Sequence, residues 1–319
     1  MTREQGVLTQ TVGGDMLADV RDGLSRAQKE LSPKYFYDER GSELFDEITR
    51  LPEYYPTRTE RELLNTHAAV WLRRYHPRSL IELGAGSADK TRVLLDAMTG
   101  ENRWYIPIDI SLTYLAEVAV RIGAEYPHLR ILPVEADLSR GPVVPPGMPK
   151  PAVIAFLGST IGNFEPAAAH RLLTRVCRAM GPHDRFLLGV DLRKDVRILE
   201  AAYNDAQGVT AAFNRNVLEV LNRQLGADFE TGAFDHVAFY NADAGRIEMH
   251  LAASRAMTVQ IPGAGAFFID DGETIRTEIS TKYDRYTIQS MFGTAGLEME
   301  SWITDAKGFY ALVGGRVRP

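Results

Sequence analysis

Residues 81–90 read IELGAGSADK, and this stretch decides the fold. An apolar run at 79–83 leads into two glycines, Gly84 and Gly86, and a helix-like stretch, KTRVLLDAM, follows. Glycines permit a sharp strand-to-helix turn and allow a ligand to approach the backbone closely. The stretch therefore predicts the first strand, turn and helix of a nucleotide-binding sheet, with a tight loop that binds nothing as the alternative.

Strand-like and helix-like segments alternate after this turn. Nearly continuous apolar strands separated by helices indicate a parallel sheet that is covered on both faces. Right-handed crossovers make such a sheet doubly wound. The strand-like runs lie at 79–83, 104–110, 129–136, 152–158 and 185–192.

The alternation stops near Leu192. A helical pattern follows to about residue 225, and then two strand-like runs, FDHVAFY and RIEMHLA, flank a turn at 241–245. The chain ends with a helix-like YTIQSMFGTAGL and two more strand-like runs, LEMESWIT and FYALVGG. We expect one domain at 59–194 and 283–319, and a second, α+β domain at 1–58 and 195–282.

Composition limits the possible functions. The 319 residues are 45% hydrophobic and 24% charged, as in an ordinary globular protein. A formal charge of −6 argues against a nucleic-acid partner, because phosphate backbones need a basic face. The single cysteine, Cys177, excludes an internal disulfide and fits a reducing compartment. Because the chain also shows no membrane span or signal peptide, we expect a cytoplasmic monomer with no membrane partner.

The residues around the glycine turn argue against a phosphate-containing cofactor. A dinucleotide fingerprint would place glycine or alanine at Asp89, where the carboxylate instead opposes a pyrophosphate. A phosphate-loop pattern also fails, because no Gly-Lys-Ser/Thr follows. Acidic residues are better suited to S-adenosylmethionine, which is cationic and carries no phosphate.

Carboxylates follow the next two predicted strands. Asp109 closes the second strand, where it can accept both ribose hydroxyls, and Asp137 follows the third, where it can accept from the adenine amino group. Each alone could be a solvated loop residue. Together with Gly84 they lie at successive strand ends, the edge at which doubly wound sheets bind ligands. The terminal strand pair also matches the Rossmann-like class I methyltransferase sheet, which has seven strands and a terminal antiparallel hairpin.

Other chemistries find less support. The Asn/Asp-Pro-Pro-aromatic motif of nucleic-acid amino-methyltransferases is absent after the fourth strand, where Gly158 to Phe164 read GSTIGNF. Asn163 in this segment is either a functional residue or a helix cap before Pro166. The seven histidines form no pair at metal-ligand spacing, so no metal is expected.

Several stretches resemble one family over nearly the whole chain. KYFYDERGSELFDEITRLPEYYPTRTE, FLGSTIGNF, AYNDAQGVTAAFNRNVL, RIEMHL and TEISTKY are similar to the histidine Nα-methyltransferases of ergothioneine biosynthesis, which form hercynine. The resemblance implies a methyltransferase core, a substrate domain and L-histidine as the substrate.

The resemblance also implies roles for individual residues. Asn163 and Tyr203 would bind the carboxylate of the amino acid, and Tyr37 would orient its amine. The cofactor residues would be Tyr37, Gly84, Lys90, Asp109, Asp137 and Leu138, where Leu138 is aliphatic at a position that is aromatic in a relative. The imidazole pocket would consist of Tyr54, Met249, Glu278 and Ser280.

Alternatives to histidine methylation remain at this stage. Tyr203 and Met249 lie on apolar stripes and could serve packing alone, and Glu278 could belong to a solvated strand face. The acceptor could be tryptophan or tyrosine, or the protein could be a non-catalytic sensor of the cofactor or an amino acid. Strand alternation places Glu278 and Ser280 on one side, which favours imidazole because both of its nitrogens can be paired.

Overall fold

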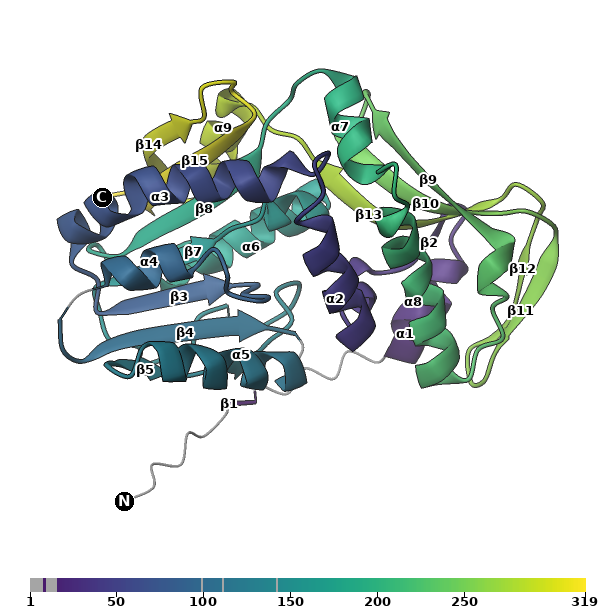
Figure 1. Cartoon of the computed structure of the whole chain (residues 1–319), viewed down its shortest axis with the longest axis horizontal. Coiled ribbons are helices and arrows are strands. Elements are labelled where there is room, and N and C mark those ends of the chain that lie inside the picture. The colour runs from purple at the N-terminus through teal and green to yellow at the C-terminus, as the bar shows by residue number, and fades with distance from the viewer. Residues whose placement is uncertain (1–7, 10–15, 99, 111, 142) are drawn as a thin grey trace. The chain divides into compact units, whose positions relative to one another are not determined.

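The computed structural model describes residues 8–9, 16–98, 100–110, 112–141 and 143–319. The chain divides into two compact units, each with a sheet of its own (Figure 1). Of the described residues, the larger unit contains Leu8–Thr9, Pro56–Arg193 and Lys282–Pro319, and the smaller unit contains 16–55 and Lys194–Thr281.

The sheet of the larger unit is mainly parallel. Its spatial order is β1, β6, β4, β3, β7, β8, β15 and β14, and β5 also pairs with β4. Among these described strands, the antiparallel pairings are those of β15 with β8 and with β14, and the other pairings are parallel. The strands are β1 (Leu8–Thr9), β3 (Ser79–Leu83), β4 (Arg103–Asp109), β5 (Leu129–Ile131), β6 (Val134–Glu135), β7 (Ala152–Phe156), β8 (Arg185–Asp191), β14 (Leu297–Thr304) and β15 (Tyr310–Val317). This confirms the predicted α/β sheet with a terminal antiparallel hairpin, in which β5 and β6 share one strand position.

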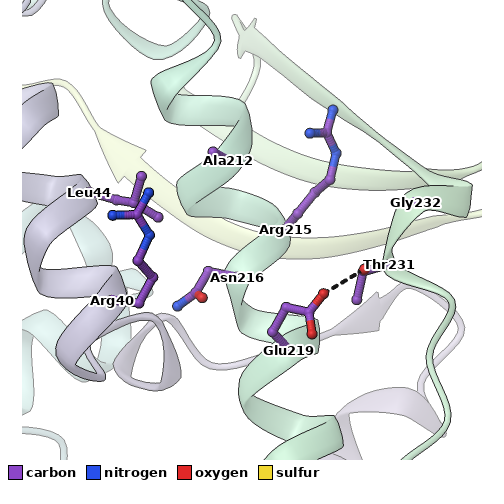
Figure 2. Close-up of a pocket in the computed structure, with 8 residues that line it drawn as sticks. All are labelled: Arg40, Leu44, Ala212, Arg215, Asn216, Glu219, Thr231 and Gly232. Atoms are coloured by element: carbon purple, nitrogen blue, oxygen red, sulfur yellow. Dashed lines mark hydrogen bonds between the residues drawn. The ribbon is translucent and has the colours of Figure 1, made fainter.

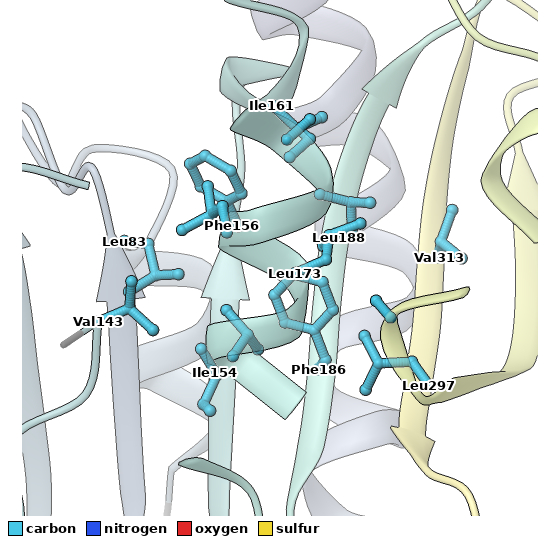
Figure 3. Packing of buried hydrophobic residues seen from close by; sticks show 14 of the residues in the cluster. Leu83, Val143, Ile154, Phe156, Ile161, Leu173, Phe186, Leu188, Leu297 and Val313 are labelled. Atoms are coloured by element: carbon cyan, nitrogen blue, oxygen red, sulfur yellow. The ribbon is translucent and has the colours of Figure 1, made fainter. Parts of the chain in front are cut away.

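Helices cover both faces of this sheet, as its apolar strands require. Every residue of β3 is buried, and neighbouring residues point to opposite faces. Leu80 belongs to a core cluster that includes Leu64 of α3. Ile81 belongs to a second cluster that includes Leu173 of α6, shown in Figure 3. The helical elements are α3 (Tyr55–Tyr75), α4 (Arg92–Ala97), α5 (Leu112–Glu125), η2 (Thr160–Asn163), α6 (Pro166–Ala179) and α9 (Arg285–Ala295).

The smaller unit is an α+β structure. Its four-stranded sheet has the order β2, β13, β10, β9, in which β10 pairs antiparallel with both β9 and β13. The strands are β2 (Lys29–Glu30), β9 (Phe234–Asn241), β10 (Arg246–Ala253) and β13 (Thr274–Thr281), and a separate hairpin contains β11 (Met257–Ile261) and β12 (Gly265–Ile269). The helical elements are α1 (Met16–Leu24), η1 (Pro33–Phe36), α2 (Glu39–Ile48), α7 (Val196–Tyr203), α8 (Val209–Leu225) and η3 (Thr231–Ala233).

The described N-terminal strand departs from the expectation that 1–58 belong to the second domain. β1 pairs in parallel with β6 of the larger sheet, with Leu8 opposite Val134. An edge strand presents unpaired backbone groups to which another segment can add. Two residues carry no periodicity that could predict such a pairing from sequence.

Candidate functional site

The glycine turn of the larger unit follows β3. Gly84 and Gly86 both have positive φ, at 69° and 49°, a region that glycine adopts without strain. The Gly84 amide donates to the carbonyl oxygen of Ile108 at 2.8 Å. A Cβ on Gly86 would meet no atom within 4 Å, so the backbone there borders open space. The turn thus offers a ligand an exposed stretch of main chain.

Asp109 at the end of β4 is fixed against this turn. Its Oδ2 accepts from the Gly86 amide at 3.0 Å, and its Oδ1 accepts from the Ile110 amide at 2.7 Å. A carboxylate has about four acceptor positions. These two backbone contacts therefore fix the orientation of the Asp109 carboxylate beside the glycine turn.

Asp137 and Leu138 follow β6. Asp137 is buried, and its Oδ1 accepts from the amide of Ser139 at 2.8 Å and from its hydroxyl at 2.5 Å. The Leu138 Cδ1 methyl would lie 4.0 Å from a Cβ on Gly84. The structure therefore brings Leu138 to the glycine turn, where its side chain forms an apolar surface.

Two further predicted residues of the larger unit lie near strand ends. Lys90 forms an ion pair with the buried Glu60 of α3. Asn163 is the last residue of η2, which begins after Ser159 at φ 57°. Asn163 does not cap α6, because the N-cap of that helix is Glu165. The helix-cap alternative for Asn163 is therefore wrong.

The smaller unit gathers predicted substrate residues from three segments. The Tyr203 hydroxyl at the end of α7 donates to Ser280 Oγ on β13 at 2.8 Å. The Tyr54 ring meets the Tyr203 ring edge-on at a centroid distance of 6.2 Å. All three side chains are buried. They form one contiguous group of aromatic rings and hydroxyls.

Strand register adds Met249 and Glu278 to this group. Met249 pairs directly with Glu278, and Ile247 pairs with Ser280. Directly opposite residues of an antiparallel pair share a face of the sheet. Glu278 and Ser280 are two residues apart, so they also share that face, and the β13 segment presents a carboxylate and a hydroxyl side by side.

Tyr37 joins the group through aromatic contacts within the smaller unit. Its ring lies 5.7 Å from the Phe45 ring and 5.8 Å from the Phe213 ring, both near edge-on. The Phe45 ring in turn lies 6.2 Å from the Tyr54 ring. Edge-to-face aromatic pairs prefer these separations. Tyr37 is thereby anchored by packing within the same aromatic group.

A separate hollow in the smaller unit contains none of the predicted residues. Arg215, which lines it, donates to the Phe234 carbonyl oxygen at 2.9 Å. Glu219 accepts from the Thr231 hydroxyl at 2.6 Å, the contact drawn in Figure 2. These groups satisfy the local backbone and one another. The hollow is lined by Arg40, Leu44, Ala212, Arg215, Asn216, Glu219, Thr231 and Gly232.

Sequence alone does not single out two buried polar residues that support these groups. Glu60 in TRTERELL resembles a solvated helix charge, although it precedes Leu63 and Leu64 by three and four positions and so shares their buried face. Asn214 of α8 is 0% exposed and contacts both β9 and β13. A polar residue at a helix position where the spacing predicts burial is the sequence signal that could have identified both Glu60 and Asn214.

The described residues contain no group of three His, Cys, Asp or Glu side chains arranged to hold a metal ion. The same part of the chain contains no helix that is both long and apolar enough to span a membrane.

The sheet order, the glycine turn and the acidic strand ends define a class I S-adenosylmethionine-dependent methyltransferase. The fold is similar to that of the CcbJ methyltransferase from Streptomyces caelestis, with a TM-score of 0.51 at 14% identity, covering 89% of this chain and 100% of that one. The family model "Histidine-specific methyltransferase, SAM-dependent" matches residues 16–316, and the chain belongs to this family.

Named relatives agree with the family. "Histidine N-alpha-methyltransferase" of Mycolicibacterium smegmatis is 46% identical over 298 residues, 92% of each chain. The protein of the same name from Mycobacterium tuberculosis is 44% identical, again over 92% of each chain. "Ergothioneine biosynthesis protein 1" of Neurospora crassa is 31% identical over 86% of this chain and 32% of its own length. The predicted family, S-adenosylmethionine as the co-substrate and enzymatic methylation of histidine are confirmed.

Proposed function

We propose that the enzyme transfers three methyl groups to the α-amino nitrogen of L-histidine, forming hercynine as the first step of ergothioneine biosynthesis. Two relatives named for this position of methylation, at 46% and 44% identity over 92% of the chain, support the proposal. The name of the Neurospora crassa relative supports the pathway.

The observation that carries the choice of histidine is the face shared by β10 and β13. Glu278 can accept a hydrogen bond from one imidazole nitrogen, and Ser280, held by Tyr203 at 2.8 Å, can pair with the other. Met249 opposite Glu278 supplies apolar contact for the ring. An indole offers a single N–H donor and would leave one of these polar groups without a ligand partner.

We assign the larger unit as the methyltransferase core and the smaller unit as the substrate-binding domain. In the core, the turn at Gly84 and the carboxylates of Asp109 and Asp137 receive the methyl donor, with Leu138 beside the adenine and Lys90 at the same loop. Asn163 and Tyr203 are each assigned to the amino acid carboxylate because they resemble the family residues with that role. Tyr54 lines the imidazole pocket.

The proposed mechanism depends on positioning. S-adenosylmethionine supplies an electrophilic methyl group on a sulfonium. In each round one N–C bond forms as one S–C bond breaks, so the amine must first lose a proton and point along the S–C axis. Tyr37 orients the amine, and burial among aromatic rings disfavours the ammonium form. Three rounds replace three N–H protons by methyl groups.

We further propose a cytoplasmic monomer that acts without a nucleic-acid or membrane partner. The net charge of −6 and the single cysteine among 319 residues support this proposal.

Incubation with S-adenosylmethionine and each of the twenty amino acids, followed by mass spectrometry, tests the reaction. Histidine should gain one, two and then three methyl groups, and fragmentation should place all three on the α-nitrogen. Methyl groups on the imidazole, or faster methylation of tryptophan or tyrosine, would contradict the proposal.

A further inference from the structure

Glu60 of α3 is a fully buried carboxylate at the carboxyl ends of the parallel strands. Its side chain is 0% exposed. One partner is the ammonium of Lys90, with which Oε2 forms a short ion pair. The Gly158 amide donates to both oxygens, at 2.8 and 3.0 Å, and the Tyr310 hydroxyl donates to Oε1 at 2.7 Å. The carboxylate therefore has a cation and two neutral donors around it.

The sheet is shaped to admit this carboxylate. A Cβ on Gly189 of β8 would overlap Glu60 Oε1 and lie 2.7 Å from the Tyr310 hydroxyl. Glycine at this position leaves the space that the carboxylate fills. Burying an ionised group is costly unless it is paired and hydrogen-bonded, and here both conditions hold.

The partners of Glu60 belong to two separate loops of the larger unit. Lys90 follows the glycine turn after β3. Gly158 follows β7 and has φ 76°, and the next residue, Ser159, has φ 57°. A non-glycine residue in this left-handed region is held there by its surroundings. η2 then carries the chain to Asn163. One carboxylate thus ties the donor loop to the loop that ends at Asn163.

A similar carboxylate lies at the opposite end of β7 and provides a comparison. Asp184 is 1% exposed and accepts from Lys150 Nζ at 2.5 Å, from the Ala152 amide at 2.8 Å and from the Gly181 amide at 2.7 Å. Like Glu60, it accepts from a lysine and from backbone amides, although a second amide takes the place of the tyrosine hydroxyl. Ligands of doubly wound sheets bind at the carboxyl ends of the strands, so Asp184 serves structure alone.

We propose that Glu60 is a positioning residue that holds Lys90 and the segment from Gly158 to Asn163 in the arrangement required by both substrates. The part of this proposal that concerns histidine binding rests on the proposed function. The part that concerns S-adenosylmethionine binding rests only on membership of the S-adenosylmethionine-dependent family.

The test compares Glu60→Gln with Asp184→Asn, because each replaces a buried carboxylate by an amide of the same shape. Both variants should unfold at lower temperature. Glu60→Gln should weaken S-adenosylhomocysteine binding in calorimetry about 10-fold and raise KM for both substrates by a similar factor, with a smaller change in kcat. Asp184→Asn should leave these constants within about 2-fold of wild type.

A folded Glu60→Gln protein with unchanged donor affinity and unchanged KM values would overturn the proposal. If Glu60→Gln does not fold, Tyr310→Phe removes one neutral donor and keeps the ion pair. It should shift both KM values in the same direction by about 2–5-fold, and unchanged values would again overturn the proposal. Failure of the wild type to methylate the α-nitrogen would contradict the proposed function, while the donor-binding comparison would still test Glu60.

Discussion

Glu60 of the larger unit and Asn214 of the smaller unit are buried polar residues of different character. Glu60 is charged and pairs with Lys90. Asn214 is neutral: it donates to His236 Nδ1 and to a backbone carbonyl, each at 2.9 Å, and accepts from Thr277 at 2.6 Å. Under the proposed function, the charged residue fixes loops for a cationic donor, and the neutral residue fixes a pocket that must distinguish one ring from another.

The largest expected effect on the free energy of unfolding comes from removing Lys90, the cation that pairs with Glu60, or Asn214, the neutral residue between His236 and Thr277. Lys90→Met leaves Glu60 buried without its cation, and such a loss destabilises a protein by about 3–5 kcal/mol. Asn214→Leu leaves neutral groups without partners and should destabilise by about 1–3 kcal/mol. Urea denaturation of both variants measures the difference.

Lys150→Met provides a comparison within the larger unit, because it also leaves a buried carboxylate, Asp184, without its cation. The Lys150 side chain is 48% exposed and that of Lys90 is 22% exposed, so the loss in Lys150→Met should be the smaller of the two. Equal losses in Lys90→Met and Asn214→Leu would remove the contrast between the units.

A second prediction concerns Glu82, a buried neighbour of Thr91 and Tyr105. Burial raises its pKa from 4.5 to about 7, although Thr91 at 2.5 Å and Tyr105 at 2.6 Å donate to it. Since the folded pKa lies above the unfolded value, its contribution to stability is fully present below pH 4.5 and is lost as pH rises through about 7.

Glu82→Gln removes this pH dependence. The stability of wild type relative to the variant should fall by roughly 3 kcal/mol between pH 4.5 and about 8, measured by urea denaturation across that range. A constant difference across the range would show that Glu82 has the same charge state in the folded and unfolded protein.

A third prediction separates substrate choice from donor binding. Glu278→Ala should lower kcat/KM for histidine by roughly 10–150-fold, because it removes a charge-assisted hydrogen bond worth about 1.5–3 kcal/mol. The loss should be much smaller for tryptophan, whose ring does not use the carboxylate. Asp109→Ala in the larger unit should instead weaken methyl-donor affinity by about 1.5–3 kcal/mol, whichever acceptor is present.

Steady-state kinetics of Glu278→Ala and Asp109→Ala with histidine and with tryptophan test both assignments. Equal losses for histidine and tryptophan in Glu278→Ala would assign this residue to the fold or the donor. Unchanged donor affinity in Asp109→Ala would remove the ribose assignment.

The smallest expected effect concerns His236 in the smaller unit. Its Nδ1 accepts from Asn214, so its Nε2 carries the proton that is donated to the Tyr203 carbonyl oxygen at 2.9 Å. Burial lowers the pKa of His236, and the positive charge of Arg215 lowers it too. The hydrogen bond to the Tyr203 carbonyl oxygen and the negative charge of Asp205 oppose this, but the pKa stays below its usual value. Its contribution to stability is therefore present above pH 6.5 and is lost as pH falls below that value.

His236→Phe should destabilise by about 1–2 kcal/mol at neutral pH and flatten the loss of stability on the acid side. Thermal melting between about pH 5 and 8 provides the measurement. An unaltered slope in His236→Phe would show that His236 does not titrate on unfolding.

The sequence predicts the larger sheet well because its signals are local. Buried strands alternate with helices, and the glycine turn has the positive φ values that its residues allow. Helix α3 begins at Tyr55, four residues before the expected start of the first domain at residue 59, since Pro56 fits a first helical turn. Local pattern cannot show that Glu60 reaches two distant loops.

The smaller unit is harder to predict because its arrangement depends on register. The β10–β13 ladder shifts between Met249 and His250, and Thr277 lies at that shift. The alternation of Glu278 and Ser280 is visible in sequence, but their pairing with Met249 and Ile247 depends on this long-range register. The contact between Tyr203 and Ser280 spans 77 residues, far beyond any local pattern.

The space at Gly189 also sets the order in which this part of the molecule can evolve. A Cβ there would overlap Glu60 Oε1 and lie 2.7 Å from the Tyr310 hydroxyl, so a side chain at position 189 requires both groups to shift. Shortening the residue at position 60 removes the closer of these two contacts and leaves the other in place. A change at position 189 is therefore least disruptive after changes at both 60 and 310, and the three positions, on one helix and two strands, depend on one another in evolution.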